Sequence, residues 1–217
     1  MNLQTWMEEY SRRMEDAFGE RIRFIGLQGS RARGEGRDDS DIDVVCILDK
    51  LFPEDVYAYR DALDGIEHRE LVCGFLGGWD ELMHWEPAEL FQFYHDTTAF
   101  IGNLDELLKC IDEEAVARAV RIGAGTIYHG CVHNMVHGKN AQVLRELYKA
   151  AGFVLRASTY LRSGEYVRRN DDLLSQLETS DLEILKTHMA LKDGAEADFD
   201  KMSDELFVWS QKYLKHK

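Results

Sequence analysis

The chain has 217 residues, of which 45% are hydrophobic and 30% are charged, and its formal net charge is −14 at pH 7. This composition is that of a globular protein with one large or two small domains, and it excludes a disordered chain. No apolar run reaches the roughly 18–20 residues of a membrane-spanning helix and the start does not resemble a secretory signal, so we expect a cytoplasmic protein without a membrane partner.

The first half of the chain mixes helical and strand-like segments. Apolar residues at helical spacing predict a helix over residues 1–18, which ends at Gly19. Strands are predicted over residues 21–27, 42–48, 68–76 and 94–101, and helices over residues 53–63, over residues 79–85 and from residue 88. Gly102-Asn103 is the natural boundary at the end of this half.

The second half of the chain has helical periodicity throughout. Helices are predicted over residues 109–121, 141–161, 181–191 and 200–214. Glycines at positions 123, 125 and 130 weaken the prediction of a continuous helix there. The pattern indicates a sheet-containing domain over residues 1–103 followed by a helical bundle over residues 104–217.

The negative charge is concentrated in the first half. Residues 1–103 hold 10 Lys and Arg against 22 Asp and Glu, whereas residues 104–217 hold 16 against 18. Such a field repels nucleic acid and favours cations, either metal ions or a cationic small substrate. Solubility alone also explains the charge, and on charge by itself we favour that explanation; a nucleic-acid partner is not expected.

The four cysteines have no CxxC pair and no regular spacing. Cys46 and Cys73 fall inside apolar strand-like runs, where a free thiol behaves as a small hydrophobic group. We therefore predict buried, reduced thiols rather than disulfides or a zinc site.

One segment of the first half has a pattern suited to phosphate chemistry. Gly29-Ser30 follows a predicted strand and opens a turn at which a phosphate can approach the backbone closely. Asp41 and Asp43 begin the next strand, and because residues two apart in a strand point to one face, their carboxylates face the same point. Carboxylate oxygens and substrate phosphates are the ligands that Mg²⁺ prefers. An Asp-x-Asp pair alone is usually a solvated strand end, but its combination with the Gly-Ser turn favours a metal site.

Residues 29–45, GSRARGEGRDDSDIDVV, resemble the polymerase-β-like nucleotidyltransferase superfamily, whose pattern is a Gly-Ser turn followed by an Asp-x-Asp strand. Residues 144–166 are similar, more loosely, to helices in the carboxy-terminal domains of its antibiotic-type members. The resemblance implies an α+β fold, in which a mixed-sheet catalytic domain over residues 1–103 precedes a helical domain that closes over the nucleotide.

The resemblance also implies roles for individual residues. Gly29 and Ser30 would hold the triphosphate, and Asp41 and Asp43 would bind Mg²⁺ or Mn²⁺. The superfamily usually carries a third carboxylate on the next core strand, as a metal ligand and general base, and Glu70 is the candidate here. A surface acid at a strand end is the alternative interpretation of Glu70, with Asp80 and Asp96 as substitutes for the third carboxylate.

Cationic side chains near these residues could neutralise the triphosphate. Arg33 is the candidate beside the turn, together with its neighbour Arg31, and Lys149 is the candidate from the helical half. The arginines could equally pair with the acids around them, Glu35, Asp38 and Asp39, which is the interpretation we favour for Arg37. Lys149 could also extend to solvent without a catalytic role.

The implied activity is metal-dependent nucleotidyl transfer, with in-line attack on the α-phosphate between two metal ions. We expect a nucleoside triphosphate donor, ATP by preference, and a hydroxyl of a small acceptor, for which the acidic charge suits a cationic compound such as an aminoglycoside. A homodimer is a possible assembly. Two alternatives remain open: a modifier of protein side chains like the minimal nucleotidyltransferase antitoxins, and a non-catalytic module that binds a nucleotide and regulates.

Overall fold

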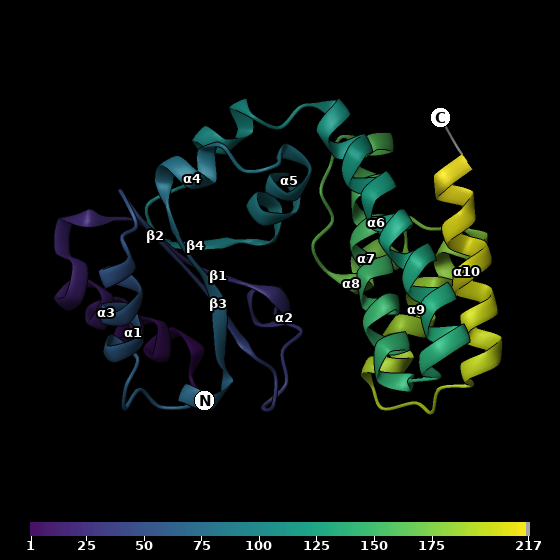
Figure 1. Cartoon of the computed structure of the whole chain (residues 1–217), viewed down its shortest axis with the longest axis horizontal. Coiled ribbons are helices and arrows are strands. Elements are labelled where there is room, and N and C mark those ends of the chain that lie inside the picture. Colours follow the sequence, from purple (N-terminus) through teal and green to yellow (C-terminus); the bar gives the residue numbers. More distant parts are fainter. Residues whose placement is uncertain (216–217) are drawn as a thin grey trace. The chain divides into compact units, whose positions relative to one another are not determined.

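The computed structural model describes residues 1–215, which divide into two compact units (Figure 1). Unit 1 comprises Met1–Glu86 and Phe93–Cys110, and unit 2 comprises Pro87–Gln92 and the chain from Ile111 onward. Unit 1 contains the sheet and unit 2 is helical, so the predicted fold class is confirmed. Every helix within residues 1–215 is too short or too polar to span a bilayer.

The compact units do not divide at residue 103, where the sequence suggested a boundary. Residues 104–110 belong to unit 1 because they pack on it: the Tyr94 hydroxyl donates to Asp105 at 3.2 Å, and the Cys110 thiol lies 3.9 Å from the carbonyl of Met83. The beginning of helix α5 (Pro87–Asp96) belongs instead to unit 2.

Unit 1 is built on a mixed four-stranded sheet with the order β3-β2-β1-β4. Strand β1 pairs antiparallel with β2 and with β4, whereas β2 and β3 are parallel. The strands are β1 Ile22–Gln28, β2 Ile42–Leu48, β3 Val72–Gly78 and β4 Thr98–Ile101. Strand β3 begins four residues later than predicted because Arg69–Leu71 forms a 3-10 turn, and β4 is shorter than predicted because α5 continues to Asp96.

One face of the sheet is covered by helices α1 (Leu3–Phe18) and α3 (Pro53–Ala62), shown in purple and blue in Figure 1. The Asn2 side chain caps α1 by accepting from the Thr5 amide at 3.2 Å. Apolar side chains of α1 and of alternate positions in β1 and β2 form a buried core: Trp6, Met7, Tyr10, Met14, Phe18, Ile25, Leu27, Ile42, Val44, Cys46 and Leu48. Which strand positions enter this core decides which positions face the other way.

The remaining elements of unit 1 are short. On β3, the ring of Phe75 packs edge-on against Trp85 and Phe93, with centroids 5.8 and 5.1 Å away. The short elements of unit 1 are η1 Gly19–Arg21, α2 Gly29–Ala32, η2 Arg69–Leu71, α4 Trp79–Met83 and η3 Asp105–Lys109, together with the last turn of α5.

Unit 2 is a helical bundle around two long helices, α6 (Glu113–His133) and α7 (Ala141–Ser163). Helix α6 extends twelve residues beyond the predicted end at Arg121, through all three glycines. These glycines do not break it because two of them let α7 approach closely: a Cβ at Gly123 would lie 2.6 Å from Val154 Cγ2, and one at Gly130 would lie 2.6 Å from Leu147 Cδ2. The bundle is completed by a π-helical turn Asn134–Gly138, α8 Asn170–Leu174, α9 Thr179–Lys192 and α10 Phe199–Lys215.

The pairing of β3 with β2 depends on a glycine, which gives a testable prediction. Gly74 has φ 136°, and an added Cβ would lie 1.9 Å from the carbonyl oxygen of Val44. We expect Gly74→Ala to lower the free energy of unfolding by about 3 kcal/mol or more, because backbone strain and a clash act together. Urea unfolding followed by circular dichroism measures this.

Gly125→Ala is the matched control. Gly125 lies inside α6, and the nearest atom to its added Cβ, Leu214 Cδ2, is 3.9 Å away. This change should raise stability by about 0.5–1 kcal/mol, since alanine favours the helix. Equal unfolding midpoints for the two variants would contradict the assigned pairing of β3.

Candidate active site

The two aspartates lie at the start of β2. Because Ile42 and Val44 enter the core under α1 and α3, Asp43 must point to the opposite face of the sheet. Asp43 is half-buried, and Asp41, two residues earlier, is exposed. The pair therefore lies at the end of the sheet where β2 begins, with carboxylate oxygens within reach of solvent.

Gly29 approaches the Asp43 carboxylate very closely. Gln28, the last residue of β1, is the Cα partner of Asp43, so the turn after β1 lies beside the start of β2. Gly29 has φ 71°, and a Cβ added there would lie 2.1 Å from Asp43 Oδ2. Only glycine fits this position. The structure thus brings Gly29, and with it Ser30, together with Asp43.

Arg31 holds the loop between the turn and the aspartates. Its Nε donates to the carbonyls of Ser40 and Asp41 at 3.0 and 3.2 Å, and its Nη2 donates to the carbonyls of Asp38 and Ser40 at 3.1 and 2.7 Å. A Cβ at Gly36 would lie 2.6 Å from Arg31 Cγ, so the loop folds tightly over this side chain. The sequence suggested the triphosphate or neighbouring acids as partners of Arg31, and did not reveal this binding of backbone carbonyls.

Arg33 pairs with Glu35, one of the acids that the sequence offered as partners, and with Asp96, a partner that the sequence did not indicate. Its Nη1 donates to both carboxylate oxygens of Asp96 at 2.7 and 2.8 Å, and its Nε lies 3.3 Å from Glu35. The three side chains are 9%, 7% and 14% exposed. Burial acts to lower the pKa of Arg33, but the two carboxylates outweigh burial and raise it. This arrangement favours a structural pair, which joins the loop to α5, over the expected contact with a triphosphate.

Glu70 and Lys149 are both exposed. Glu70 is in the 3-10 turn before β3, its side chain is 73% exposed, and Oε1 lies 3.8 Å from His68 Nδ1. Lys149 is in unit 2, on α7, with its side chain 58% exposed and Nζ 3.9 Å from Glu146. Within residues 1–215 no three His, Cys, Asp or Glu side chains form a group that could hold a metal ion. Their proposed roles remain predictions.

The face of β3 beside Asp43 carries a thiol. Cys73 is the Cα partner of Asp43, while Val72 and Leu76 pack against the core on the opposite face. Cys73 is exposed, so the prediction that it is buried was wrong. The reason is that β3 is an edge strand of the sheet. Cys46 and Cys131 are buried, as predicted.

These residues fit a divalent cation that arrives with a nucleotide. Asp41 and Asp43 supply carboxylate oxygens, and the Asp43 carboxylate lies against the backbone of Gly29. Mg²⁺ is usually held by one or two carboxylates together with substrate phosphates, and it keeps several waters. The pair therefore suffices for a metal–nucleotide complex, although it is not a complete all-protein metal site.

Comparison with known proteins agrees with this chemistry. Residues 7–78 match the family model described as a nucleotidyltransferase domain, a stretch that contains the turn, both aspartates and β3. No curated protein matches the chain in sequence.

Two solved structures are similar to the whole chain. The structure of spectinomycin adenyltransferase AAD(9) from Enterococcus faecialis, with ATP and spectinomycin, aligns over 98% of this chain and 99% of that one, with a TM-score of 0.61 and 10% identity. The match to a nucleotidyltransferase-like protein from Exiguobacterium sibiricum spans 96% of this chain and 74% of that one at 12% identity. Its TM-score of 0.37 is too low to indicate a shared fold. At such identities the likeness concerns the fold.

The family match and the shared fold confirm the resemblance found in the sequence. Residues 7–78 match a nucleotidyltransferase domain, and the fold of the chain, with its helical carboxy-terminal part, is similar to that of an adenyltransferase.

Proposed function

We propose that the protein transfers a nucleoside monophosphate from a nucleoside triphosphate, with ATP as the expected donor, to a hydroxyl of a small acceptor in the cytoplasm. The observation that carries the proposal is the position of the Asp43 carboxylate, against the backbone of Gly29 and on the strand that Asp41 opens. A phosphate that approaches this turn lies beside both carboxylates. Two carboxylates beside a phosphate turn are what metal-assisted phosphoryl chemistry needs.

Each residue of the site has a separate task. Gly29 and Ser30 receive the triphosphate along their backbone, and Arg31 keeps the loop folded so that Asp41 stays beside Asp43. Asp41 and Asp43 would hold Mg²⁺, which neutralises phosphate charge and polarises the reacting phosphorus centre. Glu70 is still the proposed third carboxylate, and a proton acceptor at that position would activate the acceptor hydroxyl.

The acceptor that fits best is cationic. Unit 1 contains most of the acidic first half, in which Asp and Glu outnumber Lys and Arg by 22 to 10. Such a field attracts a polyamine-like ring compound and concentrates it near the site. The similar adenyltransferase was solved with ATP and spectinomycin, which supports an adenylyl donor and a cyclic antibiotic-type acceptor. Polymerisation on nucleic acid is disfavoured by the same charge.

A non-catalytic nucleotide-binding role is the second candidate. It is favoured by one observation: within residues 1–215 no third metal-binding side chain lies beside the aspartate pair. A module of this kind would bind a metal–nucleotide complex and release no pyrophosphate.

The first prediction of the proposed function is nucleotide binding that requires a metal ion. ATP with Mg²⁺ should raise the melting temperature, whereas ATP alone should not, because binding to the native state stabilises it only as far as the ligand binds. GTP, CTP and UTP tested in parallel identify the donor. The double change Asp41→Asn with Asp43→Asn should abolish the shift and also pyrophosphate release in the presence of an aminoglycoside.

Asp39→Asn is the control for that test, because Asp39 is an exposed acid of the same loop and lies outside the pair. It should keep both the shift and turnover. A metal-dependent shift without pyrophosphate release from any acceptor would favour the non-catalytic role. Turnover that survives the double change would refute the site.

Arg31→Lys tests the positioning of the aspartates. Lysine keeps the charge but lacks the planar fork that reaches three carbonyls. We expect stability to fall by about 2 kcal/mol and affinity for Mg²⁺–ATP to fall roughly tenfold, because the loop no longer keeps Asp41 beside Asp43. Calorimetric titration measures the affinity. Arg60→Lys, on an exposed pair with Asp61, should change neither quantity. Lower stability with unchanged affinity would reduce Arg31 to a purely structural residue.

The exposed thiol of Cys73 reports on occupation of the site. Burial raises the pKa of the Cys46 and Cys131 thiols to about 12, so at pH 8 only about one in ten thousand of either is ionised. Iodoacetamide should therefore modify Cys73 first. Because Cys73 shares a face with Asp43, Mg²⁺–ATP at ten times its Kd should slow this modification roughly tenfold.

Cys110 is the internal control for this measurement, because it is half-buried and lies at the end of η3, away from β3. Its modification rate should not change with nucleotide. Equal rates for Cys73 with and without nucleotide, under conditions where the thermal shift is complete, would place the nucleotide elsewhere.

A further inference from the structure

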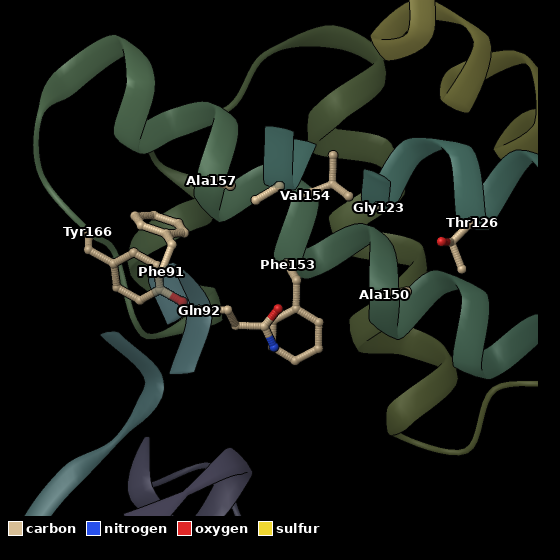
Figure 2. Close-up of a pocket in the computed structure, with 10 residues that line it drawn as sticks. Phe91, Gln92, Gly123, Thr126, Ala150, Phe153, Val154, Ala157 and Tyr166 are labelled. Carbon is tan, nitrogen blue, oxygen red and sulfur yellow. The ribbon is translucent and has the colours of Figure 1, made fainter. Parts of the chain in front are cut away.

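Unit 2 contains a cavity of about 170 Å³ (Figure 2). It lies between the beginning of α5, the middle of α6 and the middle of α7, all within one compact unit. It opens beside Gln92 and Phe153, which are half-buried. None of the residues assigned above to phosphate or metal binding lines it.

The walls of the cavity are aromatic and aliphatic. Phe91, Phe153 and Tyr166 contribute rings, and the side chains that line it include no acid and no base. The Phe91 ring is 1% exposed and is fixed between Tyr160 and Tyr166, with centroid distances of 5.0 and 5.6 Å. Phe91 is therefore a fixed and buried part of the wall, and the half-buried rings of Phe153 and Tyr166 are the ones against which a flat partner would stack or pack edge-on.

Small residues leave the space open. Ala119 on α6 and Ala150 and Ala157 on α7 face the cavity with a methyl group each. Gly123 has a different purpose, since a Cβ there would meet Val154 rather than empty space. An apolar cavity of about 150 Å³ accommodates benzene, so this volume corresponds to one ring.

A single amide gives the cavity its polar edge. In Figure 2 the Gln92 amide lies next to the Phe153 ring. A side-chain amide offers both a donor and an acceptor. This pair of groups is what glutamine uses to recognise a base edge that carries an acceptor beside an amino group. The hydroxyl of Thr126 is the second polar group of the lining.

We propose that this cavity binds an uncharged aromatic ring with a donor and an acceptor on one edge, which is the chemistry of a nucleobase. A cationic ring does not fit, because the lining offers no carboxylate to balance its charge. A phosphate does not fit either, because the lining offers no basic group. The ring has two possible sources, the base of a nucleotide or an aromatic acceptor, and in choosing between them the inference rests on the proposed function.

The experiment uses ring compounds without phosphate and without metal. Saturation-transfer NMR and calorimetric titration are carried out on the full chain with adenosine, guanosine, cytidine, uridine and benzamide. We expect at least one nucleoside to bind, and a base preference would identify the donor nucleotide. Binding of benzamide alone would assign the cavity to an aromatic acceptor. Binding of none of the five would overturn the proposal.

Variants locate the binding in the cavity. Ala119→Leu fills the space and should weaken binding at least tenfold, whereas Ala117→Leu should not change it. Ala117 is half-buried on the same helix, two residues away, and does not line the cavity. Gln92→Met keeps the size of the side chain but removes the amide, so it should weaken nucleosides and leave benzene-like rings unaffected. Binding that survives Ala119→Leu, or is matched by a cationic amino sugar, would overturn the proposal.

The outcome is separable from that of the proposed function. The dependence of the ATP shift on metal and on Asp41 and Asp43 tests the aspartate site, whereas binding of nucleosides without metal tests the cavity. If that shift is present and no ring binds, the cavity inference falls and the proposed function stands. If rings bind and the shift is absent, the proposed function falls and the cavity inference stands.

Discussion

The close approach of Gly29 to the Asp43 carboxylate is the constraint on which the site depends. It follows from register: Gln28 pairs with Asp43, so the exit of β1 and the entry of β2 are neighbours. The chain leaves β1 after Gln28, forms a loop over residues 29–41, and enters β2 so that Asp43 lies beside Gln28. Any side chain at position 29 would collide with Asp43, so glycine here is required by geometry as well as by conformation. Under the proposed function, the same contact places the backbone proposed to bind phosphate beside a carboxylate proposed to bind the metal ion.

Two arginines make that return possible, in different ways. Arg31 binds the carbonyls of the returning chain, which would otherwise need partners in a tight, partly buried loop. Arg33 pairs with Asp96 and so ties the turn to α5, at a place where neither charge is well solvated. Removing one partner of such a pair would leave the other charge buried and costly. Both guanidinium groups are engaged within the protein, so under the proposed function the charge of the triphosphate would be neutralised by the cation proposed for the aspartates.

Local pattern was sufficient to predict β2 and α1, whose apolar spacing is regular, and to find the turn and the aspartates. It failed at the start of β3. His68 has φ 58°, an unusual conformation for a residue other than glycine, and the 3-10 turn after it removes Glu70 from the strand. Which residue of β3 faces Asp43 depends on parallel pairing between distant segments. The exposure of Cys73 depends on the place of β3 at the sheet edge, and neither is visible in a local pattern.

The helical unit shows a second limit of local pattern. Glycines in α6 lower helix propensity, yet the helix continues because Gly123 and Gly130 bring α7 closer and gain packing that outweighs the propensity. The lining alanines of α6 and α7, Ala119, Ala150 and Ala157, leave a space between the helices that their side chains do not fill. The cavity keeps its shape because Phe91, which arrives from α5, is wedged between the rings of Tyr160 and Tyr166. Its existence therefore depends on a segment that precedes the bundle in sequence but packs as part of it.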